Sequence, residues 1–187
     1  MKEERIINKY QYLGRAFCDV IRSHCPFYTQ VLDVGCGHGI ASDYMRKLCD
    51  KLVLIDPSPY AYGEQLQRWR GDDKVYVQCC DIHAISGKFD LIYYFLSLHH
   101  IPNPTKELSK VRELLTRSGE LVICEIEPID SSPFHGKENV PYDGFPPSQI
   151  YNILKENQYL VKQTNDIGKI CKNQLSYNIY MVICTAS

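Results

Sequence analysis

The chain has 187 residues, a formal net charge of −1 and a hydrophobic content of 44%. This length and composition predict one soluble globular domain with a sizeable core. A charge so close to zero gives no electrostatic attraction to nucleic acid or to an acidic membrane surface. No apolar stretch approaches the length of a membrane span, and the charged start lacks the apolar region of a signal peptide. We therefore expect a cytoplasmic protein.

Nine cysteines are scattered along the chain, and no two of them form a C-x-x-C pair. An odd count without paired spacing argues against a disulfide framework and against a zinc site. Cys124 and Cys184 lie within apolar runs, where cysteine behaves as a small hydrophobe. We expect reduced thiols and no bound metal.

The first predicted elements are a helical segment, a strand and a second helix. Between residues 3 and 23, apolar side chains recur at helical spacing and predict one or two amphipathic helices. Pro26 closes this segment, since proline cannot continue a helix. A strand over 30–34 and a helix over about 39–48 follow, and a glycine-rich turn joins them.

Three glycines in that turn, Gly35, Gly37 and Gly39, have the spacing G-x-G-x-G. A strand–glycine turn–helix unit presents bare backbone N–H groups to a ligand, and glycine lets the backbone approach it closely. A dinucleotide-binding fingerprint needs G-x-G-x-x-G, so the early third glycine disfavours NAD. An acidic residue, Asp33, lies inside the strand before the turn. The alternative is an ordinary turn that binds nothing.

The second predicted strand also ends in an acidic residue. Residues 51–56 form an apolar run that ends in Asp56, and the two prolines that follow stop the strand and start a helix near 59–69. Asp56 lies 19 residues after Gly37, where a carboxylate can bind both hydroxyls of a ribose. The alternative is an exposed acid that only stabilises a turn.

Two further strands end in candidate site residues. Asp81 and Ile82 follow a short strand over 75–78, although aspartate after a strand is also a common turn residue. The strand over 89–95 is nearly all apolar or aromatic, as expected of a central parallel strand buried on both faces. The segment 96–102 after it contains two adjacent histidines.

The remaining elements alternate between helices and strands. A helix over 103–116 is expected to end before Gly119, and a fifth strand follows over 120–125. Ser148 is a plausible N-cap for a last helix. Two closing strands are predicted near 159–166 and 175–184.

Residues 126–147 differ from the rest, because they combine many turn-forming residues with aromatic side chains. A loop of this length in a compact domain is usually functional or disordered, and the aromatics argue against simple disorder. His135 lies within this loop. We expect it to lie beside the substrate.

Four features together resemble the motifs of class I S-adenosylmethionine (SAM)-dependent methyltransferases. They are the glycine turn preceded by Asp33, the strand-end Asp56, the pair Asp81-Ile82, and the segment 96–102. The resemblance covers about residues 28–185. It implies an α/β fold with a doubly wound, mostly parallel seven-stranded sheet, helices on both faces and a C-terminal antiparallel hairpin strand. This is the three-layer αβα sandwich of the Rossmann-like methyltransferase fold.

The same resemblance implies a single methyltransferase domain over residues 1–187. The helical residues 1–25 would cover the cofactor, and residues 126–147 would form the substrate-side loop. The implied cofactor is SAM, with S-adenosylhomocysteine (SAH) as the product. Its ribose would lie at Asp56 and its adenine at Asp81 and Ile82. The complete set of implied cofactor-binding residues is Asp33, Gly35, Cys36, Gly37, Asp56, Pro57, Asp81, Ile82 and Phe95.

Methyl transfer from a sulfonium is an in-line displacement for which the cofactor carries the activation. The protein aligns the two reactants and excludes water. A general base is needed only where the acceptor must lose a proton, and histidine is the usual candidate near neutral pH. The candidates are His99, His100 and His135, of which we favour His100. Each of the three could instead be a packed or solvated histidine.

A small molecule is the expected methyl acceptor, through O, N or C. Residues 95–98, Phe-Leu-Ser-Leu, do not match the Asn/Asp-Pro-Pro-Tyr motif of enzymes that methylate amide or base nitrogen. The near-neutral charge disfavours nucleic acid as a substrate, and no membrane partner is expected. Two alternatives are a SAM-binding activator or sensor that transfers no methyl group, and an NAD-dependent oxidoreductase. The sequence does not predict the oligomeric state.

Overall fold

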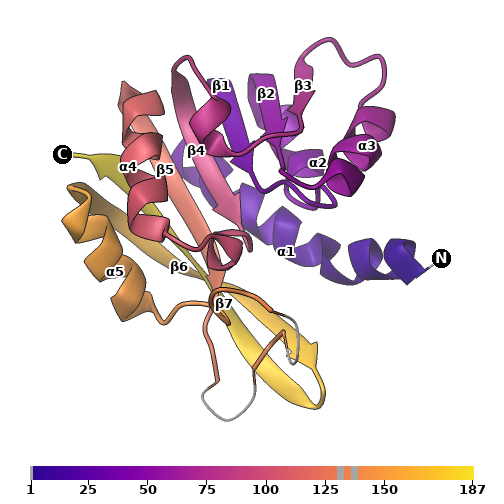
Figure 1. Ribbon diagram of the computed structural model, residues 1–187, viewed down its shortest axis with the longest axis vertical. Helices are drawn as coiled ribbons and strands as arrows, with labels where there is room; N and C mark the ends of the chain where they lie inside the picture. The colour runs from indigo at the N-terminus through magenta and orange to yellow at the C-terminus, as the bar shows by residue number, and fades with distance from the viewer. Residues whose placement is uncertain (1, 130–132, 136–138) are drawn as a thin grey trace.

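Seven strands build one mixed sheet in the order β3-β2-β1-β4-β5-β7-β6 (Figure 1). The computed structural model describes residues 2–129, 133–135 and 139–187. Strands β1 to β5 pair in parallel, and β7 runs antiparallel to both β5 and β6. The strands are β1 (Tyr28–Val34), β2 (Cys49–Ile55), β3 (Val75–Gln78), β4 (Phe89–Phe95), β5 (Leu115–Ile126), β6 (Tyr159–Lys172) and β7 (Leu175–Ala186). The predicted mostly parallel sheet with a closing antiparallel hairpin is confirmed.

Helices cover both faces of the sheet, as predicted. Figure 1 shows α4 and α5 together on one face and α1 on the other. The α-helices are α1 (Lys2–His24), α2 (Ser42–Met45), α3 (Pro59–Arg68), α4 (Pro104–Leu114) and α5 (Pro147–Glu156). Three short 3₁₀ helices are η1 (Arg46–Leu48), η2 (Ile82–Ala84) and η3 (Leu98–His100).

Strand β4 shows why the sequence forms a buried central strand. Its side chains alternate between two hydrophobic cores, one on each face of the sheet. Leu91 and Tyr93 pack into the core that contains Phe17 of α1. Ile92 and Tyr94 pack into the core that contains Leu108 of α4. A strand buried on both faces needs apolar residues at successive positions, which is the pattern seen here.

The helix predicted over 39–48 is shorter than expected. Gly35, Gly37 and Gly39 all have positive φ, at 69°, 48° and 71°, so the turn continues to residue 39. The helix α2 then has four residues and passes directly into η1. Gly39 therefore belongs to the turn and not to the start of the helix, where the sequence analysis placed it.

The prediction that Gly119 ends a helix is wrong. Helix α4 ends at Leu114, and β5 begins at the next residue. Gly119 lies within β5, where a side chain would come within 2.8 Å of the carbonyl oxygen of Phe89. The register between β4 and β5 shifts at this level, and glycine permits that close approach.

The closing hairpin is longer than predicted, because β6 runs on to Lys172 instead of ending near residue 166. Gly168, at φ 136°, lies where the pairing with β7 shifts register, so the strand continues beyond an irregularity. The hairpin extends past the other strands, beside the segment that follows β5 (Figure 1). Of the predicted substrate-side loop over 126–147, residues 130–132 and 136–138 lie outside the described residues.

Candidate active site

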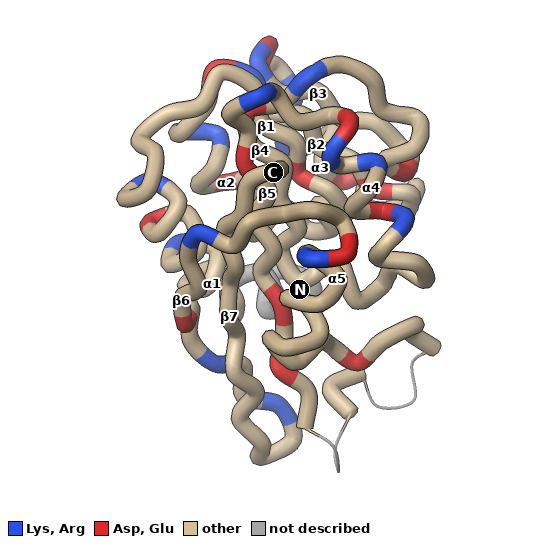
Figure 2. The backbone as a smooth tube through the Cα atoms, turned by 90° about the vertical axis from the view of Figure 1, so that its left-hand side faces the viewer, with Lys and Arg blue, Asp and Glu red and all other residues tan. Residues whose placement is uncertain are grey.

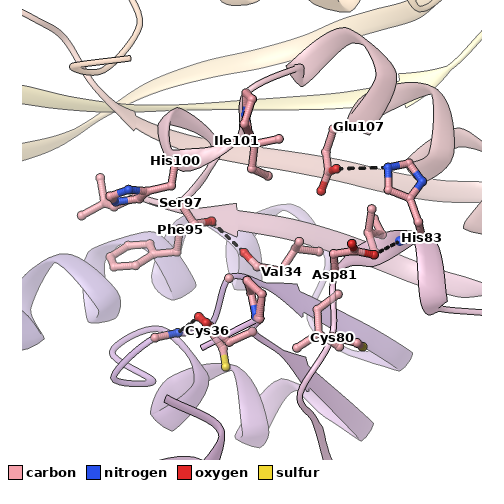
Figure 3. A pocket seen from close by; sticks show the side chains of 18 of the residues that line it. Val34, Cys36, Cys80, Asp81, His83, Phe95, Ser97, His100, Ile101 and Glu107 are labelled. Carbon is pink, nitrogen blue, oxygen red and sulfur yellow. Dashed lines mark hydrogen bonds and ion pairs between the residues drawn. The ribbon is translucent and has the colours of Figure 1, made fainter. Parts of the chain in front are cut away.

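A cleft of about 800 Å³ opens at the carboxyl ends of β1, β2 and β4, bounded by η2, η3 and the start of α4 (Figure 3). The chain proceeds from β1 towards β2 and β3 on one side, and returns to β4 and β5 on the other. Ligands of open α/β sheets bind at this point of reversal, and the volume is typical of a small-molecule site.

The glycine turn forms one wall of this cleft. The backbone N–H groups of Gly35 and Cys36 donate to the carbonyl oxygen of Ile55, which fixes the turn to the neighbouring strand. A side chain on Gly35 would come within 2.8 Å of the Cβ of Ser97. Gly37 differs, because a Cβ there would meet no atom closer than 4.0 Å. Since Gly37 lines the cleft, open space is left beside its backbone.

Asp56 lies in the cleft wall at the end of β2, as predicted. Its Oδ2 accepts a hydrogen bond of 2.9 Å from the N–H of Gly37, and its Oδ1 accepts one of 2.9 Å from Ser58. A carboxylate has about four acceptor positions, so both oxygens keep capacity for further donors. The hydrogen bonds from the turn therefore orient the Asp56 carboxylate, and acceptor positions on it remain for a ligand.

The far wall of the cleft comes from η2 and α4. Asp81 caps η2 by accepting from the N–H of His83 at 2.9 Å, and Ile82 is fully buried at the cleft wall. Glu107 lies opposite, where it accepts a hydrogen bond of 3.0 Å from the hydroxyl of Tyr94 and lies 3.8 Å from the ring of His83. Burial raises the pKa of Glu107. The sequence analysis missed Glu107, because its helical position predicts an ordinary polar face.

Asp33 lies behind the glycine turn and not among the residues that line the cleft. It is 2% exposed, and its Oδ2 accepts hydrogen bonds of 2.6 Å from both Ser42 and Tyr93. Burial raises the pKa of Asp33 to about 7. The carboxyl therefore ties β1 to α2 and β4 and positions the turn, whereas the sequence analysis placed it in direct contact with the cofactor.

Three predicted histidines come together at the ends of β4 and β5. Nε2 of His99 lies 3.0 Å from Nε2 of His135, although the two residues are 36 positions apart. The ring of His100 lies 4.3 Å from that of His99 and 5.1 Å from that of His135, measured between centroids. Of the three, His100 lines the cleft. Figure 3 shows its ring near Phe95.

Glu125, at the end of β5, holds His99 in place. Its Oε2 lies 2.7 Å from Nδ1 of His99, and its Oε1 accepts from the backbone N–H of His99 at 3.1 Å. Both residues are almost fully buried. The sequence analysis did not single out Glu125. An acid at the end of an otherwise apolar strand was the available signal, and it is the same signal that drew attention to Asp56.

The helix predicted to cover the cofactor packs against the turn. A side chain on Gly14 of α1 would come within 2.4 Å of the carbonyl oxygen of Ile40, so the helix lies directly on the segment after the glycines. Gln11 accepts a hydrogen bond of 2.7 Å from the hydroxyl of Tyr44. Among the described residues, α1 contributes none to the cleft wall.

The sequence profile described as "Methyltransferase domain" matches residues 12–164. The chain belongs to this methyltransferase domain family. A curated relative, the mitochondrial ubiquinone biosynthesis O-methyltransferase of Schizosaccharomyces pombe, is 26% identical over 171 residues. The match covers 81% of this chain and 61% of that relative, so the chain spans less than two thirds of its length.

Solved structures agree with the fold. A SAM-dependent methyltransferase from Clostridium acetobutylicum superposes with a TM-score of 0.73 at 16% identity, over 100% of both chains. The N-methyltransferase NodS of Bradyrhizobium japonicum in complex with SAH gives 0.69 at 18% identity, over 84% of this chain and 78% of NodS. The predicted Rossmann-like methyltransferase fold is confirmed. In the described part of the chain, no helix combines the length and the apolar character that crossing a membrane requires.

Proposed function

We propose that this chain is a SAM-dependent methyltransferase that transfers a methyl group to a small molecule. The observation that carries the proposal is the placement of the glycine turn and Asp56 on neighbouring strand ends around one cleft. The family of methyltransferase domains and the fold shared with SAM-dependent methyltransferases support it.

The cleft fits this cofactor in shape and in chemistry. The open space beside Gly37 lets a ligand lie against the backbone, and the side chain of any larger residue at this position would fill that space. The unused acceptor positions of Asp56 suit the two hydroxyls of a ribose. Asp81 and the apolar side chain of Ile82 suit an adenine amino group and ring. We assign Gly35, Cys36, Pro57 and Phe95 to the same site because they also line the cleft.

The histidines suit the acceptor side of the reaction. SAM, when bound, supplies a methyl group attached to a positively charged sulfur. When the acceptor attacks the methyl carbon, the sulfur keeps the electron pair of the broken bond and leaves as SAH. The chain aligns the acceptor with that methyl group and removes the acceptor's proton where one must be lost. His100 borders the cleft, and His99, held by Glu125, lies directly behind it. We assign proton removal to this cluster.

Among oxygen, nitrogen and carbon, we propose oxygen as the atom that accepts the methyl group. Curated relatives from S. pombe and from Xanthomonas axonopodis are named ubiquinone biosynthesis O-methyltransferases. The charge distribution suits a small molecule better than nucleic acid, since Figure 2 shows acidic and basic residues interspersed along the described chain. The cytoplasmic location and the single-domain organisation stay predictions.

Ligand-induced thermal stabilisation tests the proposal. SAM and SAH are expected to raise the melting temperature, and NAD is expected to have no effect. Stabilisation by NAD and not by SAM would contradict the proposal and favour an NAD-dependent oxidoreductase. Incubation with methyl-labelled SAM and a panel of small molecules that offer oxygen, nitrogen or carbon as the acceptor, with hydroxylated aromatic compounds first, then tests transfer. SAM binding without any labelled product from oxygen, nitrogen and carbon acceptors would favour a SAM-binding regulator.

A further inference from the structure

One nitrogen from each of His99, His100 and His135 lies within 4.8 Å of the other two. The sequence analysis expected no metal, but its argument rested on cysteine spacing. These histidines come from η3 and from a loop 36 residues further along, so only the fold brings them together. Three imidazoles around one point form a ligand set that is known from metal sites.

His99 is oriented as a metal ligand would be. Glu125 accepts from the backbone N–H groups of His99 and Ile126, so its oxygens act as acceptors and Nδ1 of His99 acts as the donor. The lone pair of His99 is then on Nε2, the atom that faces His135. A buried carboxylate behind a histidine ring is the usual support of a metal-binding histidine.

The spacing of the ring nitrogens of His99 and His135 suits an ion. The two Nε2 atoms of His99 and His135 are 3.0 Å apart, which is within hydrogen-bond distance. Two nitrogens bound to one tetrahedral zinc ion lie about 3.3–3.4 Å apart, given bonds of about 2.0–2.1 Å. The ion would replace this direct contact between the two rings, which would separate by a few tenths of an ångström.

The third ligand is held by its own loop. The N–H groups of Phe134 and His135 donate to the carboxylate of Asp143, at 2.5 and 2.9 Å. Lys172 of β6 donates to the carbonyl oxygen of Phe134 at 2.6 Å, and the Phe134 ring packs on Tyr177 at 5.1 Å. The loop and the hairpin therefore place His135 at the cluster before any ion binds.

We infer that His99, His100 and His135 bind one divalent transition-metal ion, with Zn²⁺ the best match, and that Glu125 supports the site. Imidazole nitrogen suits zinc and its neighbours, whereas Mg²⁺ and Ca²⁺ prefer oxygen. Three protein ligands leave a fourth position open. His100 places the site at the cleft wall. If the proposed function holds, the bound ion would promote proton loss by lowering the pKa of an acceptor oxygen, in place of direct proton removal by a histidine whose lone pair it occupies.

Titration of the metal-free full-length chain tests the site. ZnCl₂ is expected to bind with one ion per chain in calorimetry, CoCl₂ to give the visible absorption of a four-coordinate site, and MgCl₂ to give no heat. His135→Ala should lower the zinc affinity by about 100-fold or more, and Glu125→Gln by about 10–100-fold. His24→Ala is the matched control, since His24 pairs with Glu120 away from the cluster, and it should bind like the wild type.

Equal zinc affinity in the wild type and in His135→Ala would overturn the inference, as would a wild type that binds no zinc. Circular dichroism of each variant separates loss of the site from loss of the fold. SAM stabilisation, measured on the same proteins, distinguishes the two proposals. SAM binding without zinc binding would remove only the metal site. Zinc binding without SAM binding would support the metal site and contradict the proposed function.

Discussion

The site that we propose has two halves, one for the cofactor and one for the methyl acceptor, and they are built in different ways. The cofactor half takes its residues from the ends of successive parallel strands, with the glycine turn after β1, Asp56 after β2 and Asp81 after β3. The acceptor half joins η3 after β4, Glu125 at the end of β5 and His135 from the loop beyond it. The first half repeats one local strand–turn–helix unit, and the second depends on contacts between distant segments.

Each half rests on a buried carboxyl group within a strand, with different partners. Asp33 accepts from two hydroxyl groups, whereas Glu125 accepts from a histidine ring and from backbone N–H groups. The two hydroxyl groups hold the Asp33 carboxyl in place, and they do not change protonation near neutral pH. An imidazole adds a group that gains or loses a proton there. We propose that the first half binds the cofactor and that the second half acts on the acceptor, and four experiments test this division.

The largest effect is expected from Gly37→Val. A branched side chain would be strained at φ 48° and would fill the open space beside the turn, so measurable SAM binding should disappear. Calorimetry with SAM provides the measurement. Gly63→Ala is the control, because Gly63 lies on α3 with no atom within 4 Å of an added Cβ. Wild-type affinity in Gly37→Val would contradict the role of the turn.

The second test concerns the pH dependence of stability. The pKa of Asp33 is about 7 in the folded chain and near 3.8 in an unfolded one, so the folded state favours the protonated carboxyl. Its stabilising contribution is complete below about pH 4 and is lost as the pH rises towards 7. The loss is on the order of 4 kcal/mol in the free energy of unfolding.

Denaturant unfolding between pH 4 and 8 measures this loss. Asp33→Asn should remove this decline in stability, whereas the control Asp73→Asn, at an exposed position, should leave it in place. A decline of equal size in wild type and Asp33→Asn would show that another group causes it.

The third test separates the two halves directly. His100→Ala should lower the rate of methyl transfer on the order of 100-fold, as expected for loss of acid–base help, while SAM affinity stays within about twofold. Single-turnover assays with labelled SAM, next to calorimetry, measure both quantities. His24→Ala should keep both values. A parallel loss of SAM affinity in His100→Ala would place His100 in the cofactor half.

The smallest expected effect is that of Asp56→Ala. Loss of hydrogen bonds from the carboxylate to a ribose should lower SAM affinity by about 10–100-fold, at about 1.5–3 kcal/mol for a charge-assisted bond. The variant also frees the N–H groups of Gly37 and Ser58, which lie at the cleft and can bind water. Asp73→Ala serves as the control. An affinity equal to that of the wild type would remove Asp56 from the site.

The sequence by itself predicted the sheet and most of the cofactor half. Hydrophobic periodicity, glycine spacing and acids at strand ends are local signals, and parallel strands bring their carboxyl ends to one edge regardless of side-chain detail. The same local signals misplaced the start of α2 and the end of α4, because positive-φ glycines and the β4–β5 register depend on neighbouring strands.

Only the tertiary structure decided the acceptor half. In the cofactor half it withdrew Asp33 from the cleft wall and added Glu107, since the burial of each depends on which elements pack around it. In the acceptor half it joined Glu125, His99 and His135, whose contacts require β5 to pair with β4 and His135 to lie beside η3. No spacing along the chain encodes that contact, because it is a property of the folded sheet and of the loop anchored to its last hairpin.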